Sequence, residues 1–235
     1  MERNLNGIIG YGLLERDGII GEVVEFYFDD ETWAVRYLII NTVGWLANRK
    51  VLISPVAVMT KDWQNQTIPV NLTSEQIRHS PKINTDKPVS RRQEIALHKH
   101  YSWGEYRANW VYVGVDYGRS AVPVEMEKNI AVQTDFENQS GFDPHLRSTS
   151  GVSGYRIHAN DGEIGHLCDF IFDDQTWLIA YLVVDTDNWI FGKKVLIAAN
   201  YIDKVDWSKS EVFVDLSIKE IKDCREFEDT EYIQR

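Results

Sequence analysis

The sequence predicts a mainly β protein: two tandem small β-barrels, each ending in a short helix, joined by a partly helical and irregular connector. Three observations predict this fold. The chain matches itself at an offset of 144 residues, apolar and polar residues alternate within each copy, and turn signals separate the alternating runs. We therefore divide the chain into module 1 (residues 1–80), a connector (81–144) and module 2 with an acidic C-terminal tail (145–235).

The internal repeat has no gap. About 27 of roughly 79 aligned positions are identical, where chance gives about five. The clearest matches pair Gly10-Tyr11 with Gly154-Tyr155, Asp29-Asp30 with Asp173-Asp174, and Lys50-Val51-Leu52-Ile53 with Lys194-Val195-Leu196-Ile197. Each copy is therefore expected to fold as the same structural unit.

Short strands are expected in order along module 1. Asp17-Gly18 is a hairpin signal, because glycine tolerates a positive φ. A longer hairpin joins residues 22–28 to 33–40, whose β-branched and aromatic residues favour strands, and strands at 50–53 and 67–71 follow. About five or six short strands per module are typical of a small closed or nearly closed barrel.

Each module ends in a helix that is signalled by a capping box. In this motif an N-cap hydroxyl accepts a hydrogen bond from an amide in the first turn, while a Gln or Glu three residues later reaches back to the N-cap amide. The pairs are Thr73 with Gln76 in module 1 and Ser217 with Glu220 in module 2. The two copies thus use different residues for the same device.

The connector is expected to begin with a helix. Ser90 and Gln93 form a third capping box, and residues 94–101 have an amphipathic pattern that turns Ile95, Leu97 or His98, and Tyr101 towards a partner surface. Beyond Trp103, glycine and proline interrupt any period, which predicts an irregular arm.

Aromatic residues gather in this connector. We take five as candidate partner-binding residues: Tyr101, Trp103, Tyr106, Trp110 and Tyr112. Tryptophan and tyrosine are common anchors of protein interfaces, where they fill well-packed pockets. The alternative interpretation is that these rings cover the joint between the two barrels.

The composition excludes several function classes. The 25 basic and 36 acidic residues give a formal net charge of -11, and the basic residues stand singly or in pairs, so we expect no nucleic-acid partner. Cys168 and Cys224 are the two cysteines, which excludes a disulfide framework and favours a reduced, cytoplasmic location. The longest apolar runs have the length of strands, so no membrane-spanning segment is expected.

No pattern indicates an enzyme, a cofactor or a metal centre. Asp29-Asp30 and Asp173-Asp174 offer carboxylates to a divalent cation, but two adjacent aspartates before a strand are more typical of a turn. The six histidines lack the spacing of a metal site, and no nucleophile elbow or phosphate loop occurs. We therefore expect no catalytic residue, no cofactor and no metal.

The repeated pattern Gly-Tyr, Asp-Gly, Ile-Gly, Phe-x-Phe-Asp-Asp-x-Thr-Trp, Tyr-Leu and Lys-Val-Leu-Ile resembles the PRC-barrel family. That family is named after the cytoplasmic domain of the photosynthetic reaction centre H subunit. The resemblance covers both modules and implies a protein-binding or scaffolding barrel without catalytic residues. We find no counterpart of that subunit's N-terminal membrane helix, so we expect a soluble relative, and peripheral association with a membrane complex stays open.

Together these observations predict a non-enzymatic adaptor that uses the groove between the modules, and the connector, to hold a protein partner or a second copy of itself. Duplication supports this prediction, because two like barrels can pack with pseudo-two-fold symmetry. The alternative is a small-molecule or cofactor-binding protein associated with photosynthetic or other electron-transfer assemblies. A surplus of aromatic residues and an expected cleft between the barrels favour that alternative.

Overall fold

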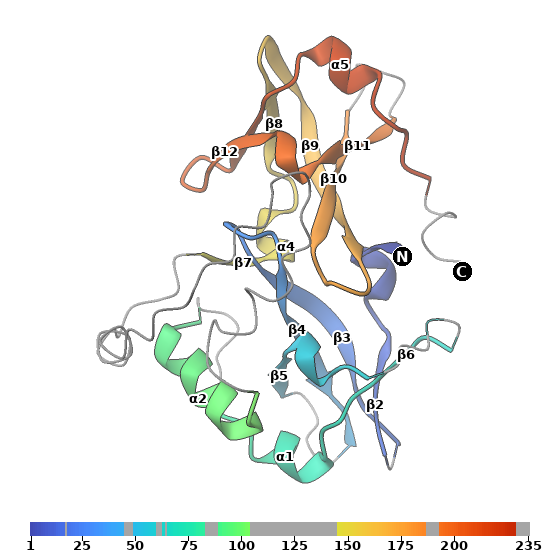
Figure 1. Cartoon of the computed structure of the whole chain (residues 1–235), viewed down its shortest axis with the longest axis vertical. Helices are drawn as coiled ribbons and strands as arrows, with labels where there is room; N and C mark the ends of the chain where they lie inside the picture. Colours follow the sequence, from blue (N-terminus) through green and yellow to red (C-terminus); the bar gives the residue numbers. More distant parts are fainter. Residues whose placement is uncertain are drawn as a thin grey trace, which may run out of the picture.

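A computed structural model of the chain describes residues 1–16, 18–44, 49–59, 63, 65–82, 89–103, 145–186 and 193–228. The protein is mainly β, as the sequence predicts. Two lobes are stacked along the long axis of the molecule, with module 1 in the lower lobe and module 2 in the upper lobe (Figure 1). In the described part of the chain, no helix combines the length and the apolar character that crossing a bilayer requires.

Module 1 contains one curled sheet with the strand order β5-β4-β3-β2-β6. β2 pairs antiparallel with β3 on one side and parallel with β6 on the other. The path runs from β5 to β6 without closing into a ring among the described residues. The strands are β2 (Gly12–Glu15), β3 (Gly18–Asp29), β4 (Val35–Thr42), β5 (Lys50–Ile53) and β6 (Thr67–Pro69), with the short helices η3 (Pro55–Ala57) and α1 (Ser74–Arg78).

Module 2 repeats this order of strands at positions 144 residues later. Its sheet runs β11-β10-β9-β8-β13-β12, so that β9 corresponds to β3 and β13 to β6. β12 corresponds to residues 58–62, of which the described Val58 forms an isolated bridge with Val70. The elements are β8 (Arg156–Ala159), β9 (Gly162–Asp173), β10 (Ile179–Asp185), β11 (Lys194–Ala198), η6 (Ala199–Tyr201), β12 (Ile202–Asp206), β13 (Glu211–Val214) and α5 (Ile218–Lys222).

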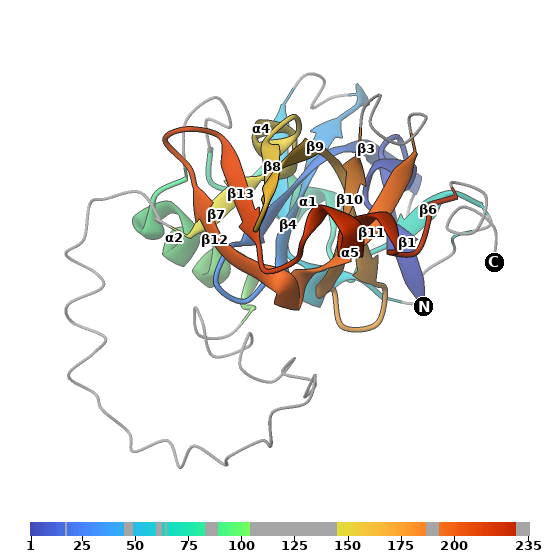
Figure 2. The ribbon, with the colours of Figure 1, turned by 90° about the horizontal axis from the view of Figure 1, so that it is seen from above.

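All three predicted capping boxes are present. Thr73, Ser90 and Ser217 each accept from the amide three residues later, and the Gln or Glu there accepts from the N-cap amide. The box at Ser90 opens α2 (Arg91–Tyr101), which lies on the opposite side of module 1 from β6 (Figures 1 and 2). Local sequence thus decides where these helices begin.

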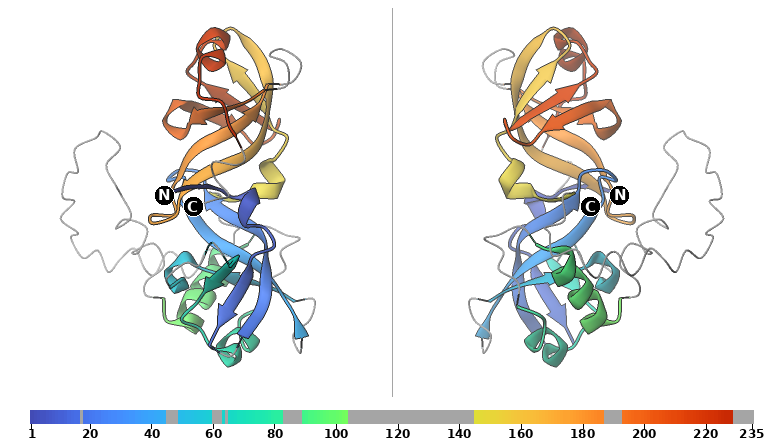
Figure 3. Two further views of the ribbon diagram at one scale, coloured as in Figure 1. Left: turned by 90° about the vertical axis from the view of Figure 1, so that its right-hand side faces the viewer. Right: turned by 90° about the vertical axis from the view of Figure 1, so that its left-hand side faces the viewer.

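The two modules exchange short strands, a feature that the sequence pattern does not predict. β1 (Glu2–Asn4), at the start of module 1, pairs with β9 of module 2, and β7 (Leu146–Ser148), at the start of module 2, pairs with β3 of module 1. The helices η1 (Asn6–Ile8) and α4 (Thr149–Val152) follow these strands. The N-terminal arm of each module therefore crosses to the other lobe at the waist of the molecule (Figure 3).

Candidate functional site

The most regular constellation among the described residues lies where the modules meet. We call it the joint, and it comprises β1, β7, the turns after β3 and β9, and the residues that contact across them. Nearly every contact in the joint occurs twice, once in each direction. The two members of each pair are 144 residues apart in sequence, which gives the joint a pseudo-two-fold axis.

Backbone hydrogen bonds cross the joint near this axis. The amide of Val35 donates to the carbonyl of Trp177 at 2.9 Å, and the amide of Ile179 donates to the carbonyl of Trp33 at 2.7 Å. Between them, Ala34 lies opposite Leu178 in an isolated antiparallel bridge. Trp33 and Trp177 have φ values of 57° and 60°, a left-handed conformation that large side chains adopt only where their surroundings enforce it.

Two arginine–aspartate pairs hold the exchanged strands. Arg3 Nε donates to Asp174 Oδ2 at 3.0 Å, and Arg147 Nε donates to Asp30 Oδ2 at 2.8 Å. Each guanidinium also stacks on a tryptophan of its own module, at 4.4 Å from Trp63 for Arg3 and at 4.1 Å from Trp207 for Arg147. Each arginine is thereby oriented by its own module and bonded by the other.

The contacts of Asp174 in the joint change the pKa of its carboxyl group. Burial on its own would raise the pKa of the Asp174 carboxyl. Hydrogen bonds from the N-terminal amino group, Arg3 and Gln175 outweigh that effect and hold the pKa below its ordinary value. The folded joint therefore favours the ionised, carboxylate form of Asp174.

The paired aspartates act as turn and joint residues, as the turn interpretation predicts. Asp29 Oδ1 accepts from the amides of Glu31 and Thr32 at 3.1 and 3.0 Å, and Asp173 closes the equivalent turn in module 2. The second aspartate of each pair crosses the joint instead. Among the described residues, no group of three or more His, Cys, Asp or Glu side chains is arranged to hold a metal ion.

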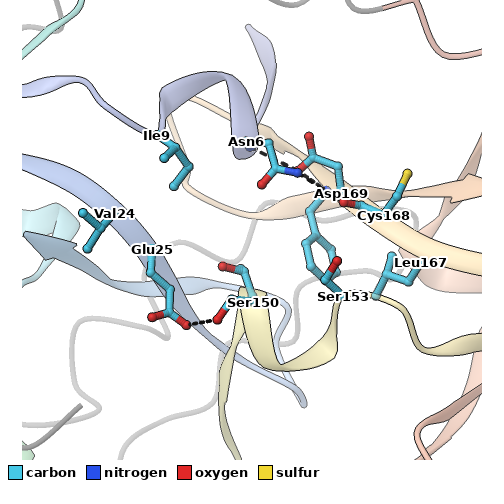
Figure 4. A pocket seen from close by; sticks show the side chains of 11 residues that line it. Asn6, Ile9, Val24, Glu25, Ser150, Ser153, Leu167, Cys168 and Asp169 are labelled. Carbon is cyan, nitrogen blue, oxygen red and sulfur yellow. Dashed lines mark hydrogen bonds between the residues drawn. The ribbon is translucent and has the colours of Figure 1, made fainter. Parts of the chain in front are cut away.

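A cavity of about 280 Å³ opens at the joint, between β3, β9 and the first turns after the exchanged strands (Figure 4). Four pairs of equivalent residues line it, so it lies on the pseudo-two-fold axis. The pairs are Asn6 with Ser150, Ile9 with Ser153, Val24 with Cys168, and Glu25 with Asp169. Thr149, Leu167 and Phe170 complete the lining.

Each carboxylate in the cavity accepts hydrogen bonds from the other module. The hydroxyls of Ser148 and Ser150 donate to Glu25, the latter at 2.6 Å. Asp169 accepts from the side-chain amide of Asn4 and from the backbone amide of Asn6, both at 3.1 Å. The lining described above contains two acidic side chains and no basic one, so its charge suits a cationic ligand.

Cys168 is an unsuitable nucleophile in this cavity. Burial raises the pKa of its thiol to about 11, and the thiol donates to the carbonyl of Val183 at 3.2 Å. At neutral pH the sulfur is therefore protonated, whereas nucleophilic cysteines act as thiolates.

A second constellation docks α2 against module 1. Arg36 and Glu94 are 1% and 0% exposed, and their side chains meet at 2.5 Å. Arg36 also bonds Asp29 at 3.2 Å, and the Tyr37 hydroxyl lies 3.1 Å from His98 Nε2. Sequence reasoning missed this ion pair, although an arginine inside the apolar β4 run was a visible signal.

Two of the five predicted partner-binding residues, both in the connector, are packed against module 1. Tyr101 and Trp103 are 5% and 8% exposed, and their rings stack at 4.4 Å within the core beneath α2. Neither ring is presented at the surface, because both are needed to bury the helix. Tyr106, Trp110 and Tyr112 lie outside the described residues, so their role stays a prediction.

One outer surface differs sharply between the modules. In module 1, Leu14 is the cross-strand neighbour of both Ile19 and Pro69, and the amide of Met59 donates to the carbonyl of Pro69. We call these four residues the outer row. Ile19 and Met59 are each 56% exposed, so the row presents apolar side chains to solvent.

The equivalent row of module 2 is more polar, although Phe213 takes the place of Pro69. Glu163 and Asp203 replace Ile19 and Met59, while His158 replaces Leu14 and stacks on Phe213 at 4.9 Å. Lys204 lies 4.5 Å from the same Phe213 ring. The duplicated sheet thus folds with either kind of surface, so the fold does not require the apolar one.

Comparison with protein families gives a match within module 1. The model of the PRC-barrel domain matches residues 2–77, the span of module 1 from β1 to α1. A search of curated proteins gives no match to the chain.

Proposed function

The chain belongs to the PRC-barrel family through residues 2–77, and from that membership we propose that it is a non-enzymatic adaptor that binds a protein partner. PRC-barrel domains commonly mediate protein interactions. Two such modules in one chain would hold two surfaces at a fixed orientation, because the exchanged strands tie the lobes together at the joint.

The outer row of module 1 carries this proposal. Exposed apolar side chains are ordinary when scattered, but four neighbours across adjacent strands form a surface that a partner can bury. Module 2 serves as an internal comparison, since Glu163 and Asp203 put charged residues at two of the four equivalent positions there. We therefore assign partner contact to the outer row of module 1 and a different contact to module 2.

The test places residues of module 2 at the equivalent positions of module 1. In the double variant Ile19→Glu, Met59→Asp, each new residue is the one that module 2 carries at the equivalent position, so the sheet should tolerate both. Tagged wild-type protein should retain a stoichiometric protein from lysate of its native cell, and the variant should retain at least tenfold less.

The matched control is Glu163→Gln, Asp203→Asn, which neutralises the equivalent row of module 2 and should leave capture unchanged. Circular dichroism would verify that both variants are folded. Equal capture by the wild type and the Ile19→Glu, Met59→Asp variant, or no stoichiometric capture by the wild type, would rule out this assignment.

A second candidate function is favoured by the cavity at the joint. Its two carboxylates and its volume of about 280 Å³ suit a small cationic molecule with an apolar part. Native mass spectrometry of freshly purified protein should then show added small-molecule mass, which Glu25→Gln should reduce. A bare mass for the wild-type protein would remove this candidate and leave the adaptor proposal untouched.

A further inference from the structure

We propose that the joint is a protein–protein interface in its own right and that its second natural partner is another copy of this chain. In the two-chain form, module 1 of each chain docks on module 2 of the other, so that two joints close a symmetric dimer. The inference rests on the geometry of the joint and is independent of the adaptor proposal.

The joint has the construction of an isologous interface between subunits. Its contacts are non-covalent and reciprocal: each module donates an edge strand, an arginine and a tryptophan carbonyl to the other. An interface of this kind repeats every contact about a two-fold axis, as in homodimers. Nothing in these contacts depends on both modules belonging to one chain.

Charge and hydrogen bonding do not distinguish one chain from another. Arg3 meets Asp174 in the same geometry whether the aspartate lies in its own chain or in a second copy, and the same holds for Arg147 and Asp30. Covalent linkage raises the effective concentration of two binding modules, so the closed monomer predominates in dilute solution.

One pair of side chains makes the joint selective for unlike modules. Ala34 and Leu178 face each other across the pseudo-two-fold axis, a small residue against a large one. Two copies of module 1 would place two alanines there and leave a void, whereas two copies of module 2 would crowd two leucines. The dimer that forms should therefore contain joints between module 1 and module 2.

The first experiment removes the covalent link from the otherwise complete protein. A specific protease site is inserted between residues 104 and 144 of the full chain, and the protein is cut after folding. The two pieces should elute together at 1 μM as a 1:1 complex. Separation of the pieces at that concentration would overturn the proposal.

The second experiment measures exchange between chains. Two uncut proteins of different mass are mixed at 1 mM, opened in mild urea, returned to buffer and analysed by native mass spectrometry after dilution. Mixed dimers should appear, whereas the same treatment at 1 μM should give monomers. A complete lack of mixed dimers at 1 mM would overturn the two-chain form.

A swap of the axis pair tests selectivity and controls for misfolding. Ala34→Leu should weaken association of the cut pieces at least tenfold, because it places two leucines at the axis. Adding Leu178→Ala restores a small–large pair and should recover association. Failure of the double variant to recover, with both pieces folded by circular dichroism, would show that this pair does not select the partner.

Discussion

Gly165 occupies a position in the β9 ladder that excludes any side chain. Its φ is +131°, and a Cβ there would lie 2.0 Å from the backbone carbonyl oxygen of Asp185 in β10. Gly21 has the same role in module 1, where a Cβ would lie 2.5 Å from the carbonyl oxygen of Asn41. The repeated Ile-Gly of the sequence thus marks a close approach between two strands.

Gly165→Ala should therefore destabilise the protein by more than about 1 kcal/mol, because the backbone must shift to relieve the contact. Urea denaturation would measure the loss. Gly151→Ala is the matched control, since Gly151 lies in α4 and the nearest atom to its added Cβ is the Ser148 hydroxyl at 3.2 Å. Equal stability of the two variants would contradict this account.

The pKa of the Tyr101 phenol reflects the burial of its ring beneath α2. Desolvation raises the pKa of its phenol from 10.0 to about 12. The unfolded chain releases this proton first, so the contribution of Tyr101 to stability is present below pH 10 and is lost as the pH rises towards 12. Absorbance titration would compare the wild type with Tyr101→Phe. The variant should lack one tyrosine in the late part of the curve, above pH 10. A tyrosine missing near pH 10 instead would refute this assignment.

At the scale of elements, α2 is fixed by the Arg36–Glu94 pair. Removing one partner of a buried ion pair leaves the other charge desolvated and unpaired, which costs about 3 kcal/mol. Asp29, which also bonds Arg36, compensates for part of that cost.

We expect Glu94→Ala to loosen α2, to expose Trp103 and to shift tryptophan fluorescence to longer wavelength. Glu94→Gln retains a hydrogen-bonding group and should have about half the effect on stability. Lys99→Ala, on an exposed position of the same helix, should change neither readout. A fluorescence shift with Lys99→Ala as large as with Glu94→Ala would contradict the assignment.

Local elements could be predicted from sequence because the interactions that define them are local. A capping box needs four consecutive residues, and the aspartate turns need five, so Ser90 and Asp29 carry their own signals. The exchange of β1 and β7 could not be predicted. Strand pairing depends on which edge is free in the folded sheet, and the sequence of Glu2–Asn4 is compatible with either lobe. The sequence does predict a cleft between the modules, but the residues that line the cavity follow from the strand exchange and could not be named in advance.

For the whole molecule, acid should weaken the joint. The pKa of Asp174 is lowered in the folded state, so its contribution to stability is present above the unfolded value of 3.8 and is lost as the pH falls below it. Asp174→Asn should cost about 3 kcal/mol at pH 7, because it leaves Arg3 buried beside a neutral group.

The same variant should show a shallower loss of stability below pH 3.8 than the wild type. Urea midpoints measured from pH 7 to pH 2 would give both curves, with Asp203→Asn on the exposed surface as the control. Parallel curves for wild type and Asp174→Asn would mean that this carboxylate does not titrate with unfolding.

The crossed arms also set the order in which the chain can finish folding as it is synthesised. Residues 27–29 of β3 have no neighbour on one side until residues 146–148 have left the ribosome, because β7 is that neighbour. Module 1 therefore waits with an open strand edge while the connector is being made, and an open edge invites pairing with other chains. Slowing translation between these two points should increase aggregation of the nascent protein, even though the finished protein keeps that edge covered.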